Sequence, residues 1–317
     1  MVGKYDIEIY NNRVHYFLTV KRNITIVKGN SATGKTELIR LIAELEANGS
    51  SSGITLKCEK KCTVLTNIDW ELRLSSLSQA IVFIDETAAF IRSKRFAELV
   101  KGSDNYFVIV TRDDLSQLPY SVEEIYGLRN SSDSSKYKTY KKIYNEMFKM
   151  YNLNTYNLVN RDIVITEDSN SGFQFFSGVF PKCESAKGKS NIYEAIRNNS
   201  NQSVLAIVDG AAFGSEIGKI MGYLSVNDIN CVIYAPESFE YLILKSGIID
   251  VPAEVLENTY QYADSKSYIS WENYYTDYLI QISRNTIFKY SKTKLNENFL
   301  ADKIKEKIKQ VMPEQIR

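Results

Sequence analysis

Histidine is almost absent from this chain: His15 is the single one among 317 residues. One histidine excludes serine–histidine triads, histidine-rich metal sites and histidine general bases as the source of an activity. His15 itself lies in the alternating stretch RVHYFLTV, which is typical of a strand, so we expect a structural role for it.

Excess charge of one sign and long apolar runs are missing as well. The 39 basic and 38 acidic residues give a net charge of +1, so any contact with nucleic acid has to be local. No apolar run approaches the roughly 18 residues that cross a bilayer. The first residues, MVGKYDIEIYNN, resemble neither a signal peptide nor a transit segment. We therefore expect a cytoplasmic protein with no membrane partner.

Cysteine is too sparse for a zinc site. Cys58 and Cys62 lie in ITLKCEKKCTVLT, which predicts two short strands around a Glu-Lys-Lys turn, while Cys183 and Cys231 stand alone. A structural zinc needs four Cys or His ligands, and no second pair is present. We expect structural cysteines, with the pair across the hairpin as reduced thiols.

The chain length suits two domains. Strands alternate with helices in both halves, which predicts the α/β class. The polar cluster NSSDSS at 130–135 indicates a boundary. The predicted organisation is a first α/β domain over 1–130, a linker helix over 131–159, a second α/β domain with a parallel sheet over 160–250, and a helical region over 251–317. The linker segment is rich in lysine and tyrosine, and two roles stay open for its lysines: contacts to phosphates, or a solvated helix face (Lys136, Lys138, Lys141 and Lys142).

The strongest motif is GNSATGKT at 29–36, which matches the Walker A pattern between an apolar strand and a helix. In such a loop the backbone N–H groups wrap phosphates, Lys35 reaches the β and γ phosphates, and the Thr36 hydroxyl can ligate Mg²⁺. This motif predicts ATP and Mg²⁺ as cofactors. The predicted nucleotide-binding residues of the loop are Gly29, Asn30, Ser31, Ala32, Thr33, Gly34, Lys35 and Thr36.

Two further apolar strands end in polar residues. AIVFIDE at 80–86 is similar to a Walker B strand, in which Asp85 would hold Mg²⁺ and Glu86 would orient or deprotonate the attacking water. YFVIVTRD at 106–113 ends in Arg112, which either senses the γ-phosphate or is an ordinary salt-bridged arginine. Arg92 and Arg95 are candidates for a finger that reaches a neighbouring subunit.

Residues 1–128 resemble the ABC and AAA branches of P-loop ATPases. The resemblance implies an ATPase with Lys35 and Glu86 as catalytic residues. Two ABC features are missing, because Arg112 stands where an ABC protein has a histidine and no LSGGQ sequence lies at the required place.

The second half carries acidic residues after two predicted strands: Glu167 follows strand 162–167, and Asp209 ends strand 203–209. Open parallel sheets gather ligands at this edge. Residues 160–247 resemble the Toprim domain of topoisomerases, primases and the overcoming-lysogenization-defect nucleases. The resemblance implies Mg²⁺ on Glu167 and Asp209 for phosphodiester chemistry. Ala211 replaces the second aspartate of the family pattern, and Asp168 or Glu237 could compensate; a Rossmann-like domain whose acidic strand ends cap helices is the alternative.

Two functions follow from these motifs. In the first, an ATPase is coupled to a Toprim-like domain that acts on or senses nucleic acid, as in phage defence or DNA maintenance. In the second, a nucleotide-dependent regulator or scaffold has an inactive second domain. Either function would use a homo-oligomer or a partner protein.

Overall fold

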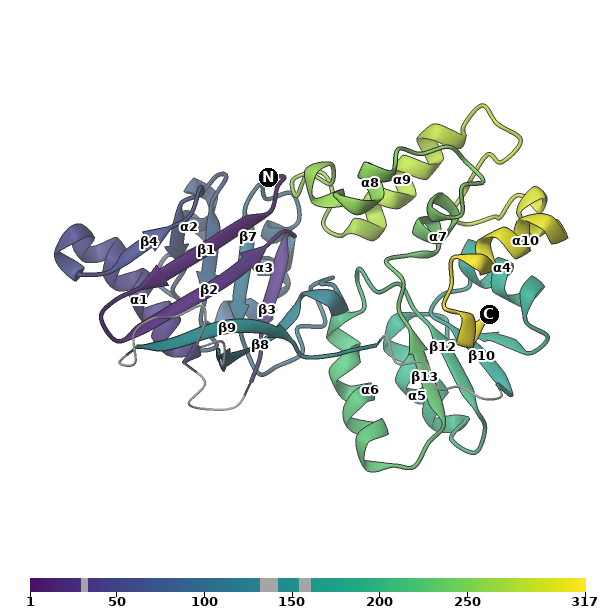
Figure 1. The fold of residues 1–317 in the computed structure, drawn as a ribbon, viewed down its shortest axis with the longest axis horizontal. Coiled ribbons are helices and arrows are strands. Elements are labelled where there is room, and N and C mark those ends of the chain that lie inside the picture. The colour runs from purple at the N-terminus through teal and green to yellow at the C-terminus, as the bar shows by residue number, and fades with distance from the viewer. Residues whose placement is uncertain (30–33, 132–141, 154–160) are drawn as a thin grey trace. The chain divides into compact units, whose positions relative to one another are not determined.

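The computed structural model describes residues 1–29, 34–131, 142–153 and 161–317 (Figure 1). The chain divides into two compact units, one of Met1–Tyr151 with Tyr260–Ile269 and one of Asn152–Thr259 with Ser270–Arg317. Both units combine helices with a mostly parallel sheet, so the predicted α/β class is confirmed. The boundary near 151 lies inside the segment predicted as a linker, and the predicted C-terminal region is divided between the units.

The first unit is built on a nine-stranded sheet with the order β4-β1-β2-β9-β8-β3-β7-β6-β5. The run β8-β3-β7-β6-β5 is parallel throughout, whereas β4-β1-β2 and the β9-β8 pair are antiparallel. The strands are β1 Tyr5–Tyr10, β2 Val14–Val20, β3 Ile24–Val27, β4 Thr55–Lys57, β5 Cys62–Val64, β6 Ile81–Ile84, β7 Tyr106–Val110, β8 Ile125–Asn130 and β9 Ile143–Lys149.

The central parallel strands are buried on both faces because their sequences are apolar throughout, as in ITIV of β3, IVFI of β6 and YFVIV of β7. Helix α1 (Lys35–Asn48) packs its apolar side chains on one face of the sheet. The core there contains residues of β1 and β2 as well as residues of the central parallel strands. On the other face, the rings of Phe96 in α3 (Lys94–Val100) and Phe107 in β7 pack edge to face, with their centroids 5.9 Å apart, and Trp70 of α2 (Trp70–Ser76) stacks on Phe90. Short 3₁₀ turns complete the unit (η1 Gly49–Ser52, η2 Ala89–Arg92, η3 Val122–Glu124).

Two predictions about secondary structure are wrong. The cysteine segment is not a hairpin: β4 pairs with β1, whereas β5 pairs with β6, so they lie at the two ends of the strand order. The predicted linker helix is a strand in its described part, β9, which pairs with β2 and β8. Its sequence IYNEMFK pairs on both sides, with β2 and with β8, and this cross-strand pairing outweighs helix propensity there. Lys136, Lys138 and Lys141 lie outside the described residues.

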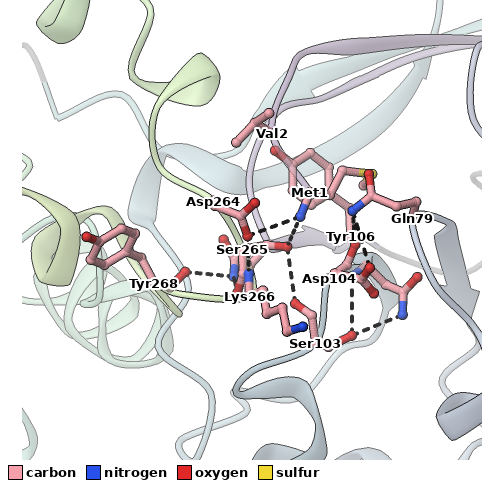
Figure 2. Close-up of polar contacts among 12 residues, drawn as sticks. Met1, Val2, Gln79, Ser103, Asp104, Tyr106, Asp264, Ser265, Lys266 and Tyr268 are labelled. Carbon is pink, nitrogen blue, oxygen red and sulfur yellow. Dashed lines mark hydrogen bonds and ion pairs between the residues drawn. The ribbon is translucent and has the colours of Figure 1, made fainter.

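The segment Tyr260–Ile269 belongs to the first unit although it follows most of the second in sequence. The backbone N–H of Gly3 donates to the Tyr260 carbonyl at 2.6 Å, and the Asn23 amide donates to the carbonyls of Ser265 and Tyr268 at 3.1 and 2.9 Å. Figure 2 shows the Ser265 hydroxyl between the amino group of Met1, at 2.9 Å, and the Ser103 carbonyl, at 3.1 Å. These contacts fix the segment beside the start of β3.

The second unit has a four-stranded parallel sheet with the order β11-β10-β12-β13. Its alternation of strands and helices over 162–235 confirms the sequence prediction closely. The elements are β10 Ile163–Thr166, α4 Ser171–Val179, β11 Cys183–Ser185, η4 Lys189–Asn191, α5 Ile192–Asn198, β12 Val204–Ile207, α6 Gly214–Val226, β13 Cys231–Tyr234, α7 Phe239–Lys245, α8 Ala253–Glu257, α9 Trp271–Ser283, η6 Glu297–Leu300, α10 Asp302–Gln310 and η7 Glu314–Ile316. The short turn η5 (Thr259–Gln261) begins at the last residue before the segment Tyr260–Ile269 and continues into it.

Candidate functional site

The predicted nucleotide site lies at one edge of the first sheet. Strand β7 separates β3 from β6, and the register pairs Val27 with Val110 and Ile84 with Ile109. The carboxyl ends of these three parallel strands therefore finish side by side. The Walker A loop, the Asp85-Glu86 pair and Arg112 each follow one of these strands, so the fold brings them to the same edge.

Lys35 is the first residue of α1 and is buried. Its Nζ donates to the Gly29 carbonyl at 2.8 Å, across the loop to which both residues belong. Burial lowers the pKa of Lys35, nearby Arg112 lowers it further, and Glu86 partly opposes the shift. Lys35 is therefore close enough to Glu86 and Arg112 for their charges to affect its pKa. Thr36 is exposed in the first helical turn, and Asn30, Ser31, Ala32 and Thr33 lie outside the described residues.

Asp85 and Glu86 have different surroundings. One Asp85 oxygen, Oδ2, accepts from the Thr87 hydroxyl at 2.9 Å, whereas Oδ1 is buried and has no hydrogen-bond partner among the described residues. Glu86 Oε2 lies 3.2 Å from Arg112 Nε in an ion pair at the solvent edge. Arg112 is thus salt-bridged in the structure, and its partner is the predicted catalytic carboxylate itself; its other predicted role, as a sensor of the γ-phosphate, stays a prediction.

The finger candidates are both engaged within the unit. Arg92 donates to Asp113 at 2.6 Å, and Arg95 lies 3.0 Å from Glu71. The sequence also missed Lys28, which is buried at the end of β3 and ion-pairs with Asp114 after β7. This pair links the loops that follow two neighbouring strands.

Gly34 shows why the loop needs glycine at its final turn. Its φ is +85°, a conformation that side chains disfavour, and an added Cβ would lie 2.7 Å from the Tyr16 hydroxyl. That hydroxyl donates to the Gly34 carbonyl at 2.8 Å, so β2 supports the loop directly.

Replacing Gly34 with alanine is expected to weaken, at least ten-fold, the ATP binding that the Walker A pattern predicts, because the loop must move away from Tyr16 and the strained φ costs about 1–2 kcal/mol. Equilibrium titration with a fluorescent ATP analogue measures the effect. Gly49→Ala is the matched control: it has a φ of +55° at the other end of α1 with nothing within 4 Å of the added Cβ. Adding Tyr16→Phe to Gly34→Ala should restore part of the affinity, and equal losses in both alanine variants would contradict the explanation.

In the second unit, Glu167 and Asp209 lie together as predicted. The backbone N–H of Asp209 donates to Glu167 Oε2 at 3.0 Å, and the N–H of Glu167 donates to the Ile207 carbonyl at 3.1 Å. The backbone N–H of Phe239, at the start of α7, donates to Asp209 Oδ1 at 3.2 Å. Three strand and helix ends thus converge on two carboxylates.

These carboxylates line a cavity of about 20 Å³, which has room for about one water molecule or ion. Two residues that the sequence did not indicate also line it, Glu240 on α7 and Lys292 after α9. Glu240 is 1% exposed and accepts from the Tyr290 hydroxyl at 2.6 Å, while its Oε2 has no hydrogen-bond partner among the described residues. Lys292 lies 3.4 Å from Glu240 and 2.6 Å from Glu272.

Glu240 therefore adds a deeply buried carboxylate to Glu167 and Asp209 in this cavity. Ala211, which is buried, stands where the resemblance implies an aspartate. Of the two compensating candidates, Asp168 lines the cavity but accepts hydrogen bonds from Asn170, and Glu237 does not line it. No sequence pattern ties Lys292 to this edge, because it lies in the region after the parallel sheet.

Burial and neighbouring acidic groups both change the pKa values of the ionisable side chains around this cavity. Burial raises the pKa of Glu167 to about 7, with smaller contributions from Glu272 and Asp168, against the effect of the Asp209 N–H and Lys189. Burial and the neighbouring carboxylates raise the pKa of Asp209 well above its ordinary value. Burial opposes protonation of Lys292, but Glu240, Glu272 and Asp209 together raise its pKa. The cluster holds protons at neutral pH that a divalent cation could displace.

Both sites contain carboxylate oxygens that could bind a cation, but these oxygens do not form a complete ligand shell. Among residues 1–29, 34–131, 142–153 and 161–317, no three His, Cys, Asp or Glu side chains are arranged to hold a metal ion. Each site nevertheless presents a buried carboxylate oxygen to which no described residue donates a hydrogen bond, Asp85 Oδ1 in one and Glu240 Oε2 in the other. Such an oxygen is costly to bury unless a ligand satisfies it, so the donor chemistry fits a divalent cation at each site.

Comparison with known proteins adds no relative. No protein-family model matches the chain, and no curated protein sequence matches it. In the described part of the chain, no helix has the length and apolar character to cross a membrane.

Proposed function

We propose that the first unit binds ATP with Mg²⁺ and hydrolyses it. The observation that carries this proposal is the meeting of Lys35, Glu86 and Arg112 at the carboxyl ends of three adjacent parallel strands. A Walker A match alone is a sequence pattern. Its occurrence beside a carboxylate and an arginine, which arrive from two other strands, is what phosphoryl transfer requires.

The residues suggest a division of roles. Lys35 would exchange the Gly29 carbonyl for the β and γ phosphates, which are stronger acceptors for an ammonium. Asp85 and Thr36 would hold Mg²⁺, which neutralises phosphate charge when it is bound. Glu86 would orient the attacking water and accept its proton. Arg112 pairs with Glu86 in the structure, so the γ-phosphate would compete with Glu86 for the guanidinium and free the carboxylate for this role.

Nucleotide binding tests the proposal most directly. The wild type should bind ATP more tightly with Mg²⁺ than without it, and Lys35→Ala should lose at least about ten-fold in affinity, since charge-assisted bonds contribute about 1.5–3 kcal/mol. Isothermal titration calorimetry measures both. Lys94→Ala, at the start of α3, is a control with the same change of charge. Wild-type protein that binds no ATP, or equal affinity of both variants, would refute the proposal.

For the second unit we propose an action on nucleic acid that depends on a divalent cation. The specific observation in its favour is the cavity lined by Glu167, Asp209 and Glu240, in which one buried carboxylate oxygen has no hydrogen-bond partner among the described residues. The cation would be held by Glu240 with Glu167 or Asp209, not by all three carboxylates at once, and would polarise a phosphodiester, while Lys292 would supply positive charge beside it. A homo-oligomer or a partner protein, and a role in phage defence or DNA maintenance, stay predictions that follow from the resemblance.

Cleavage assays separate this proposal from the alternative of a nucleotide-dependent regulator with an inactive second unit. Plasmid, single-stranded DNA and RNA are incubated with Mg²⁺ or Mn²⁺, and the products are resolved by electrophoresis. The proposal expects cleavage that Glu167→Gln abolishes and that Glu184→Gln, an exposed change on β11, leaves intact. Nucleic acid that stays whole with both ions favours the regulator.

A further inference from the structure

Cys58 and Cys62 flank a short turn that joins the two edge strands of the first sheet, and both sulfur atoms contact the backbone of Lys60 within this turn. Cys58 follows β4 and Cys62 begins β5, and these strands lie at opposite ends of the strand order. Only three residues separate the two cysteines, and a connection this short spans little more than about 14–18 Å. The sheet must therefore curl until its edges approach, and the turn holds both thiols in one place.

The two sulfur atoms have different surroundings. Cys58 is half-buried and accepts a hydrogen bond from the Lys60 N–H at 3.5 Å, whereas Cys62 is buried and donates to the Lys60 carbonyl at 3.8 Å. The neighbouring Cys62 thiol and the Lys60 N–H lower the pKa of Cys58 to about 7, in spite of burial. Proximity to Cys58 and burial raise the pKa of Cys62. Cys58, the less buried sulfur and the acceptor of an N–H, is therefore the better nucleophile of the two.

Cys58 is also accessible to small molecules. It lines a surface hollow of about 560 Å³ over β1, β2 and β4, together with charged side chains of both signs (Asp6, Glu8, Lys57 and Glu59). This volume accommodates a peptide-sized thiol reagent. The other cysteines differ, since burial raises the pKa of both Cys183 and Cys231 to about 12.

We propose that Cys58 and Cys62 form a reversible intramolecular disulfide by exchange with a low-molecular-weight disulfide. The Cys58 thiolate attacks one sulfur of the reagent, RSSR, forms a mixed disulfide and expels RS⁻. Cys62 then loses its proton to solvent and attacks the Cys58 sulfur, which expels the second RS⁻. The protein pair loses two protons and two electrons, and RSSR becomes two RSH.

The structure gives a reason for this order of steps. An attacking thiol exchanges fastest when its pKa lies near the ambient pH, which describes Cys58. The interactions that raise the pKa of Cys62 depend on the Cys58 sulfur as acceptor and charge. Once Cys58 carries the mixed disulfide, its negative charge is gone and Cys62 ionises more readily. The attack by Cys62 is therefore favoured only after the mixed disulfide on Cys58 has formed.

The test incubates the full chain with oxidised glutathione, quenches it with N-ethylmaleimide and maps the four cysteines by peptide mass spectrometry. The wild type should give a Cys58–Cys62 cross-link that dithiothreitol reverses. Cys62→Ser should stop at the glutathione adduct on Cys58, and Cys58→Ser should give neither product. The double variant Cys183→Ser/Cys231→Ser is the matched control and should behave as the wild type does.

The wild-type map requires no substitution, so it stays decisive if a serine variant misfolds. Four alkylated thiols in the wild type, a persistent glutathione adduct, or a cross-link through Cys183 or Cys231 would each overturn the proposal. The pH dependence of the rate of Cys58 alkylation is an independent check. The rate should rise with a midpoint near pH 7, the pKa of Cys58, and not near the value of about 8.5 of a free thiol.

Discussion

Replacing Glu86 with glutamine is expected to lower ATP turnover by about 10²–10⁴-fold, the usual contribution of a general base. Glutamine keeps the shape of the side chain but cannot accept the proton of the attacking water. ATP affinity should be retained or increased, because a negative charge near the γ-phosphate is removed and Arg112 loses its carboxylate partner. Steady-state phosphate release and equilibrium ATP titration measure the two effects separately.

A matched control and a double-mutant cycle test this expectation further. Glu98→Gln changes an exposed carboxylate on α3 that pairs with an arginine, Arg95, and it should leave turnover unchanged. Arg112→Ala should also lower turnover, and the combined variant should show a loss smaller than the sum of the two in free energy, since the residues act as one pair. If Glu86→Gln turns over as fast as the wild type, Glu86 is not the base and the carboxylate only positions Arg112.

The second large effect is a pH dependence of stability that comes from Glu167. Its pKa rises from 4.5 to about 7 on folding, so the folded state favours the protonated form. The stabilisation is present in full below about pH 4.5 and is lost as the pH rises through about 7; the shift corresponds to ~3 kcal/mol. The wild type should therefore melt at lower temperature at about pH 8 than at about pH 5, by roughly 6–12 °C for a unit of this size.

Glu167→Gln should remove most of that slope and melt above the wild type at about pH 8, because a neutral amide occupies the buried position at every pH. Scanning calorimetry between about pH 5 and pH 8 provides the measurement, and Glu184→Gln on β11 serves as the control. Added Mg²⁺ should raise the melting temperature of the wild type at about pH 8 and leave Glu167→Gln unaffected. A wild type whose melting temperature rises with pH in this window would contradict the assignment.

Local patterns predicted the second unit well. Apolar strands such as IVIT and VLAI, with polar breakers and amphipathic segments between them, indicate strands and helices wherever local preference and burial agree. The segment IYNEMFK was misjudged because lysines and tyrosines before it suggested a helix, whereas pairing with β2 and β8 decides its state. Strand partners come from distant parts of the chain, and a local pattern carries no information about them.

The sequence by itself determined the α/β class, the match of 29–36 to the Walker A pattern with Lys35, and the acidic strand ends Asp85, Glu86, Glu167 and Asp209, because these depend on short-range spacing of residue types. Only the tertiary structure decided what meets them. The strand order sets Arg112 against Glu86 at the solvent edge, and α7 and the segment after α9 bring Glu240 and Lys292 to Glu167. The contacts around Glu167 bury polar groups whose cost is offset only by partners that the whole fold supplies.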